Sequence, residues 1–315
     1  MQNLADYLEW LLNLPIENRV KYLDYFLNTI SDGFAILDKD LRYQYVNKAF
    51  LNRRENTPDD FIGKKLLDIF PSLKDSPRYE AYLKVLETGE PVVFNFALTE
   101  EDSDYLKINA FRIKDGLAII TEDLTRNIAF ENTILELHRH ARILQEAETC
   151  DDIYKITLDV MDKVLGFGTF DILMRQGVQL KQVAALSLPL GTGVPLDING
   201  VTVRAFKQQK TMLVNDLSKD EGYYKIRNPD TGQPFTEYLP SLSELSSPII
   251  VDGVSIGVLN VESPEYNKFT DHDAIFLEIL AIHVADAIKR LDNLNRILEQ
   301  ETQFTQFAES SQDMI

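Results

Sequence analysis

Apolar residues recur along this chain at helical spacing in some stretches and at alternate positions in others. Steps of three and four on both sides of Pro15 predict two amphipathic helices within residues 1–30. Alternating positions then predict five strands, at 33–38, 42–46, 92–98, 105–113 and 116–122. Asn47 suits the N-cap of a short helix, and Ser76 suits that of a longer one. The first part of the chain therefore consists of two strands, several helices and three strands.

The same two spacings return after residue 149 and predict a second domain. Thr149, with Asp152 three residues later, forms a capping-box pattern at the start of a helix. A further helix is expected at 201–209. Five strands are expected at 169–174, 179–187, 211–214, 249–251 and 254–261. The last two strands flank Asp252 and Gly253, a pair that favours the left-handed backbone of a type I′ hairpin turn. A tight hairpin followed by a long helix is the clearest local signal in the sequence.

Two helical stretches carry apolar residues at alternating steps of four and three, which is typical of a coiled coil. One stretch lies within 126–148 and the other starts at Thr270. The predicted seam consists of Ile134, Leu137, Ala141, Leu144, Val284, Leu291, Leu294 and Leu298. We therefore expect a homodimer that pairs through these helices. For the shorter stretch, packing against its own domain is the alternative.

The composition limits the partners of the chain. A formal net charge of −18 over 315 residues repels phosphate and anionic lipid, so we expect no nucleic-acid binding and no direct membrane contact. The only cysteine, Cys150, cannot form an internal disulfide, and no apolar run reaches the length of a membrane helix. A cytoplasmic protein is therefore expected.

Four segments of the first domain resemble the PAS family, at 32–38, 46–50, 62–70 and 123–125. The resemblance implies an antiparallel sheet with helices across one face that enclose a small pocket. It also implies that Asp123 and Thr125, in the closing Asp-Leu-Thr, couple the sheet to the following helix. An acidic strand end with a Thr N-cap explains the same two residues without any coupling.

Two segments of the second domain resemble the GAF family of ligand-sensing modules, at 200–216 and 243–263. The predicted fold class is α+β, with two domains that each have a central antiparallel sheet flanked by helices and are joined by long coiled-coil-type helices. The expected divisions are N-terminal helices at 1–30, a PAS-like domain at 31–125, a helical linker at 126–148 and a GAF-like domain at 149–290. A signalling helix with the start of a further PAS-like unit is expected at 291–315.

Bulky residues on the predicted inner strands and helices are the candidate pocket walls. In the PAS-like domain they are Phe34, Tyr45, Phe50, Phe61 and Phe94. In the GAF-like domain they are Phe170, Ile172, Phe206, Val214, Tyr223 and Ser247. Core packing is the alternative role for each of these residues.

No catalytic or metal-binding constellation emerges from the sequence, so we expect no enzyme activity and no metal from this segment. The PAS-like domain has neither Cys nor His, which excludes a flavin–cysteine adduct and His-ligated haem there, and the cofactor stays unknown. The order PAS then GAF resembles the sensory segment of sensor histidine kinases of two-component systems. We expect a module that binds a small molecule or partner and signals to a downstream output domain. The alternatives are a ligand-free dimerisation scaffold and a cyclic-nucleotide-binding regulator.

Overall fold

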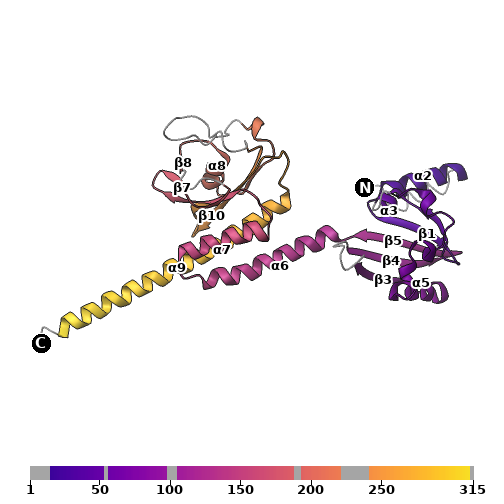
Figure 1. Ribbon diagram of the computed structural model, residues 1–315, viewed down its shortest axis with the longest axis horizontal. Helices are drawn as coiled ribbons and strands as arrows, with labels where there is room; N and C mark the ends of the chain where they lie inside the picture. Colours follow the sequence, from indigo (N-terminus) through magenta and orange to yellow (C-terminus); the bar gives the residue numbers. More distant parts are fainter. Residues whose placement is uncertain (1–14, 53–55, 98–104, 188–192, 221–240, 313–315) are drawn as a thin grey trace. The chain divides into compact units, whose positions relative to one another are not determined.

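The computed structural model describes residues 15–52, 56–97, 105–187, 193–220 and 241–312. They fall into two compact units, Met1–Ala129 and Phe130–Ile315. Each unit is built around one antiparallel sheet (Figure 1). Among the described residues, no helix combines the length and the apolar character that are needed to cross a bilayer. The predicted α+β class is confirmed for both units.

The sheet of the first unit has five strands in the order β2-β1-β5-β4-β3, and every neighbouring pair is antiparallel. The strands are β1 Gly33–Asp38, β2 Tyr43–Val46, β3 Val92–Ala97, β4 Tyr105–Ile113 and β5 Gly116–Asp123. Their bounds agree with the predicted strands to within one residue wherever the chain is described. The β1–β5 pairing places the two ends of the domain side by side at the centre of the sheet.

Short helices cover one face of this sheet. They are α3 Lys48–Asn52, α4 Leu66–Ile69 and α5 Pro77–Thr88, with 3₁₀ turns at Pro58–Asp60 and Pro71–Leu73. The Ser76 hydroxyl accepts a hydrogen bond from the Tyr79 amide, and Gly89 ends α5 with a φ of 79°. Between helices and sheet lie fully buried side chains that include Leu37, Tyr43, Leu66, Tyr82 and Ile108.

Helix α2, Ile16–Thr29, precedes the sheet and is held at its C-terminal half. The Tyr45 hydroxyl donates to Asp24 at 2.9 Å, and the Lys48 amide donates to Asn28 at 2.7 Å. The other end of α2 keeps its apolar side chains in solvent, and Val20 is 62% exposed. The described part of this domain's sheet therefore does not cover that end of α2. The other predicted N-terminal helix lies outside the described residues.

Asn47 joins three segments of the first unit and is the source of a testable stability prediction. Its side-chain oxygen accepts from the amides of Phe34 and Phe50, and its amide group donates to the carbonyls of Leu27 and Asp32, all at 2.7–2.9 Å. Asn47 is fully buried, so its loss leaves these backbone groups without their partner. The predicted N-cap is confirmed through the Phe50 amide.

We expect Asn47→Ala to lower the free energy of unfolding of the first unit by about 2–3 kcal/mol, because two buried donors and two buried acceptors lose their partner. Urea denaturation followed by circular dichroism measures the change. Asn52→Ala, on the exposed end of α3, is the matched control and is expected to stay within about 0.5 kcal/mol of the wild type. Equal stabilities of the two variants would contradict the role of Asn47.

The sheet of the second unit has six strands in the order β8-β7-β6-β11-β10-β9. The strands are β6 Phe170–Gln176, β7 Gln179–Leu186, β8 Gly193–Pro195, β9 Met212–Val214, β10 Ser243–Val251 and β11 Val254–Ser263. Asp252 and Gly253 join β10 to β11 with φ values of 49° and 78°, so the predicted turn with two left-handed residues is confirmed. In this order β6, β11 and β10 are central strands, and each of them pairs with a neighbouring strand along both of its edges.

Helices lie on both faces of this second sheet (Figure 1). They are α7 Cys150–Lys163, α8 Val201–Gln208 and α9 Asp271–Gln312. Helix α6, Thr125–Glu146, adds Leu137 and Leu144 to the apolar cluster of this unit. Helix α8 packs on one face of β10 and β11, whereas α7 and α9 share a large apolar cluster with the other face. The Thr149–Asp152 capping box at the start of α7 is confirmed. A 3₁₀ turn, Leu217–Lys219, follows β9.

The predicted coiled-coil seam is largely occupied within one chain. Leu137 and Leu144 of α6 and Val284 and Leu291 of α9 are buried in the cluster beneath the second sheet. Ile134 packs against the same cluster, and Ala141 is half-buried. Only Leu294 and Leu298 of the seam stay exposed. Helix α6 therefore packs against its own unit, which was the alternative, because its apolar residues fit the apolar surface that α7 and α9 present.

Candidate functional site

The five predicted pocket residues of the first unit divide between the two faces of its sheet. Phe50, Phe61 and Phe94 belong to the core between sheet and helices. Phe61 contacts Phe50 edge-on, with ring centroids 5.3 Å apart. Phe34 and Tyr45 instead pair with each other, 6.3 Å apart, and alternate with the core-facing positions of β1 and β2. The structure therefore does not bring all five residues to one face of the sheet.

The predicted pocket residues of the second unit are also divided. Phe170 and Ile172 point toward α7 and α9 and are buried in the large cluster. Phe206 lies on the opposite side of the sheet, in a smaller cluster beneath α8. Ser247 and half-buried Val214 lie at the β9–β10 edge, and Tyr223 lies outside the described residues. The described residues among them do not surround one cavity, because Phe170 and Ile172 face α7 and α9 while Phe206 packs on the opposite face of the sheet.

Polar residues form a row across the three central strands, on the face that α8 covers. Asp171 of β6 is directly opposite Asn260 of β11, which is in turn opposite Ser246 of β10. One step along the same face, Glu244 of β10 is opposite Glu262 of β11. All of them except the half-buried Glu262 are buried, which is unusual for polar residues in the middle of a sheet.

A small cavity of about 30 Å³ lies between this row and α8. Its polar walls are Asp171, Glu244, Asn260, Glu262 and Thr202, and its apolar walls are Leu173, Val194, Ile198, Gly200 and Val201. Val201 begins α8 directly after Gly200, whereas Leu173 belongs to β6 and Val194 to β8. The cavity therefore combines an apolar roof with a floor of carboxylates.

Hydroxyl and amide groups supply the hydrogen bonds in the floor of the cavity. Thr202 donates to Oε1 of Glu244 at 2.8 Å. The Ser246 hydroxyl lies 3.2 Å from the same Glu244 oxygen and 2.6 Å from Oδ1 of Asn260, although it carries one proton for these two acceptors. Nδ2 of Asn260 donates to Glu262 at 3.2 Å. With its carboxyl groups ionised, the network thus has more acceptors than donors.

Asp171 is the least satisfied group of the floor. Its Oδ2 accepts from Nε2 of Gln182 at 3.1 Å, while its Oδ1 has no hydrogen-bond donor among the described residues. Only 4% of Asp171 is exposed, and its carboxylate lines the small cavity. A buried carboxylate oxygen without a donor is costly in free energy, and native proteins rarely leave one unexplained.

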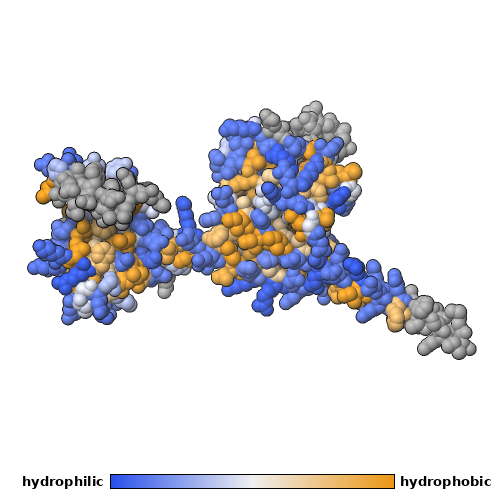
Figure 2. Space-filling view, turned by 180° about the vertical axis from the view of Figure 1, so that it is seen from behind, coloured by the Kyte–Doolittle hydropathy of each residue, from blue (hydrophilic) through white to orange (hydrophobic). Residues whose placement is uncertain are grey.

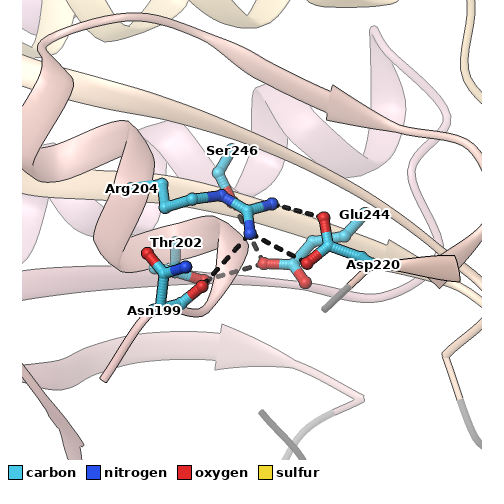
Figure 3. A network of polar contacts seen from close by, with 6 residues as sticks. All are labelled: Asn199, Thr202, Arg204, Asp220, Glu244 and Ser246. Atoms are coloured by element: carbon cyan, nitrogen blue, oxygen red, sulfur yellow. Dashed lines mark hydrogen bonds and ion pairs between the residues drawn. The ribbon is translucent and has the colours of Figure 1, made fainter. Parts of the chain in front are cut away.

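The nearest cationic side chain already has a partner. Arg204 of α8 holds Asp220 through both of its terminal nitrogens, and its Nη1 also donates to the Asn199 carbonyl at 3.2 Å (Figure 3). This bidentate pair clamps the end of the 3₁₀ turn that follows β9 to α8. Glu244 therefore lies near a positive charge that is held by another carboxylate.

Burial changes the protonation of the floor. Desolvation, followed by the charge of Glu262, raises the pKa of Asp171 to about 7. The same two causes raise the pKa of Glu244 to about 8, against the hydrogen bonds from Thr202 and Ser246. Near neutral pH both carboxyl groups therefore exist partly in their protonated forms.

Sequence reasoning missed this row of polar residues because it searched for bulky pocket walls. A signal was present in the hairpin itself, where Glu244, Ser246, Asn260 and Glu262 occupy alternate positions next to apolar residues of the two strands. Strands in the middle of a sheet that carry polar residues on one face indicate a buried polar site. Asp171 is not distinguishable in this way, because the next position on its side of β6 is Leu173.

The predicted coupling residues lie at the junction of β5 and α6. The Thr125 hydroxyl accepts a hydrogen bond from the Tyr105 amide at 3.0 Å, and the Thr125 amide donates to the Asp123 carboxylate at 2.9 Å. The first turn of α6 is thereby tied to the start of β4 and to the end of β5. The Thr125 side chain thus contacts the neighbouring strand.

Comparisons with known proteins place two regions of the chain in known families. No curated protein matches the chain significantly. Solved structures similar to part of it include a free methionine-R-sulfoxide reductase from Neisseria meningitidis in complex with its substrate, at 19% identity, 50% of this chain, 89% of that chain and a TM-score of 0.43. The GAF domain of a phosphoenolpyruvate-protein phosphotransferase from Coxiella burnetii is similar at 16% identity, over 53% of this chain and 98% of that chain, with a TM-score of 0.46.

A part of a methyl-accepting chemotaxis protein, residues 122 to 287, is similar at 25% identity, over 49% of this chain and 98% of that chain, with a TM-score of 0.42. Two family models match the sequence directly. Residues 27–128 match the model of the PAS fold, and residues 147–289 match that of the GAF domain. The chain therefore contains a PAS domain followed by a GAF domain.

Proposed function

We propose that the chain is a sensory module in which the cavity beneath α8 binds a small molecule and α9 passes the response to a downstream output domain. The observation that carries this proposal is the position of β10. On one face of this strand Glu244 and Ser246 line or border the cavity, and on the other face Leu245 and Ile249 pack in the cluster that includes α9. Any occupant of the cavity therefore acts on a strand that supports the signalling helix.

A polar contact adds to the link between β10 and α9. The Thr211 hydroxyl lies 3.0 Å from the Ser247 hydroxyl of β10 and 3.2 Å from the Glu278 carboxylate of α9. These residues border a groove of about 410 Å³ between the sheet edge and α9. A ligand can shift the equilibrium between two packings of α9 only by the difference in its binding free energy for the corresponding arrangements of β10.

The lining of the cavity bears on the cyclic-nucleotide alternative. Asp171, Glu244 and Glu262 would each repel the phosphate of a cyclic nucleotide in a site of low dielectric constant. The cavity also has room for far less than a nucleotide. A small ligand without a negative charge suits the cavity better.

The first unit contributes to the proposed signalling through its junction with α6. We assign a coupling role to Asp123 and Thr125, because their hydrogen bonds tie β4 and β5 to the start of that helix. A change of packing in the PAS sheet would then alter the first turn of α6. Helix α6 continues into the apolar cluster of the second unit.

Native mass spectrometry of the full chain from its own host tests the proposed function for any retained ligand. We expect the native wild-type protein to be heavier than its polypeptide chain alone, and we expect this excess mass to disappear on denaturation. Thr202→Leu, which extends an apolar side chain into the cavity, is expected to carry less of this mass. Thr88→Leu, at an exposed position of the first unit, is the control and should retain it. Equal retention by wild type and Thr202→Leu, verified as folded by circular dichroism, would contradict binding in this cavity.

The exposed part of α9 supports self-association, which we also propose. Leu294 and Leu298 are 45% and 51% exposed, and they continue the spacing of buried Leu291. Figure 2 shows apolar colour recurring along this projecting part of the helix. A second copy of α9 carries the same stripe, and in a parallel pair the two stripes would face and cover each other.

We expect Leu294→Lys combined with Leu298→Lys to raise the dissociation constant of the dimer at least tenfold, or about 1.4 kcal/mol, and to leave the fold intact. Sedimentation equilibrium measures the change. The control combines Asn293→Lys with Gln300→Lys, which adds the same charge seven residues apart on another line of the helix. Equal dissociation constants for the two double variants would contradict pairing through this stripe. Leu291 is unsuitable for this test, since it is buried within one chain.

A further inference from the structure

We infer that the cavity beneath α8 recognises a protonated primary amine, either the ammonium ion or the head group of a small organic amine. This inference rests on the proposed function and names its ligand class. The first argument is the charge of the walls. Asp171, Glu244 and Glu262 line the cavity together, and none of its described wall residues is a lysine, arginine or histidine. The nearest guanidinium, that of Arg204, is held by Asp220.

The second argument is the shortage of donors. Oδ1 of Asp171 is buried and has no donor among the described residues, and the single proton of Ser246 faces acceptors on both Glu244 and Asn260. A primary ammonium group carries three N–H donors and no acceptor, as the lysine head group does. It would supply the missing donors and neutralise part of the negative charge at the same time.

The third argument is size. The cavity of about 30 Å³ exceeds the roughly 10–15 Å³ that one water molecule needs, so it accommodates a group of ammonium size. A metal ion is less suited, because no three of the described His, Cys, Asp and Glu side chains are grouped so that they could hold one. The geometry thus favours a hydrogen-bonding cation over a coordinated metal.

Protons compete with the amine for the same carboxylates. The charged and titratable groups around the site are Asp171 of β6, Glu244 of β10, Glu262 of β11, Arg204 of α8 and Asp220 after the 3₁₀ turn. Burial raises the pKa values of Asp171 and Glu244 to about 7 and about 8. The carboxylates must lose these protons to hold a cation, so the amine should bind more tightly as the pH rises from 6 to about 8.5, where a primary ammonium group is still charged.

Titration of the full chain with methylammonium chloride tests the inference, in amine-free buffer and at constant ionic strength set with NaCl. The measurement is the thermal unfolding midpoint of the second unit at pH 8. We expect a saturable rise with methylammonium and with ammonium, and none with tetramethylammonium, which has no N–H donor. Glu244→Gln is expected to weaken the apparent affinity at least tenfold, whereas Glu299→Gln, on the exposed part of α9, should leave it unchanged.

Three outcomes would overturn the inference: equal midpoints in methylammonium and NaCl, an equal response to tetramethylammonium, or an unchanged affinity of Glu244→Gln. An equal response to KCl would also overturn it, since the site would then take any monovalent cation. None of these outcomes removes a ligand found by native mass spectrometry. A retained mass together with a failed amine titration would therefore leave the proposed function in place and reject only the ligand class.

Discussion

Glu244→Gln is expected to stabilise the GAF domain at pH 8.5, by on the order of 4 kcal/mol, although it removes a residue of the candidate site. The pKa of Glu244 is raised from 4.5 to about 8 in the folded domain by burial and by Glu262. Each unit of such a shift corresponds to about 1.4 kcal/mol.

The direction of the pH dependence follows from the raised pKa. Below about pH 4.5 the folded and unfolded chains both hold the proton of Glu244, and its stabilising effect is complete. Between this pH and about 8 the folded domain keeps a proton that the unfolded chain releases, so stability falls as the pH rises. Asp171, with its pKa raised to about 7, adds a loss in the same direction. Glutamine has no proton to lose and removes the Glu244 part of the slope.

Urea denaturation at pH 5.5, 7 and 8.5 measures this effect, with circular dichroism as the probe and an amine-free buffer. The wild-type GAF domain should lose stability across the series, and Glu244→Gln should lose less. Glu299→Gln removes an equal charge from an exposed position and is the control. A wild type whose stability rises with pH in this range would show that Glu244 is ionised in the folded domain without cost.

Leu137→Asp is expected to destabilise the GAF domain by on the order of 5 kcal/mol, even in dilute, monomeric protein. Leu137 of α6 is fully buried in the cluster that α7 and α9 form beneath the sheet. The substitution removes this apolar burial and places a carboxylate among apolar side chains, where it has no partner. Phe130 of the same helix stacks on Phe276 of α9 at 5.0 Å, so α6 would detach from a surface that it fits closely.

Chemical denaturation at several protein concentrations measures the effect. Leu135→Asp is the matched control, because Leu135 lies on the same helix and is 57% exposed. It should change the stability of the domain little. If the loss caused by Leu137→Asp appeared only at concentrations where the chain self-associates, Leu137 would belong to a seam between chains.

Local chemistry was enough to predict most elements of the fold. The Asp252–Gly253 turn, the Thr149 capping box and the Asn47 N-cap depend on neighbouring residues, and the structure has each of them. Alternation of apolar and polar positions located the strands for the same reason, since it records which side chains face a core. The two families could also be inferred, because their signatures are continuous stretches of sequence.

The candidate site could not be predicted in this way, because it depends on which face of a sheet lies under which helix. Phe170 and Asp171 are neighbours in β6, yet one packs against the α7–α9 side and the other faces the cavity. Alternation separates the two faces and does not identify the helix that covers each of them. The spacing of Leu137 and Leu144 likewise has the same form whether the partner is a second chain or α9 of the same chain.

The most direct test of the central claim is hydrogen exchange on the full chain with and without saturating methylammonium chloride, at pH 8 and matched ionic strength. The claim is that an amine in the cavity acts through β10 on α9. It predicts slower amide exchange in β6, β10 and β11, together with changed exchange in the part of α9 that packs on β10. Exchange rates in β10 and α9 that are the same with methylammonium as with tetramethylammonium would contradict it.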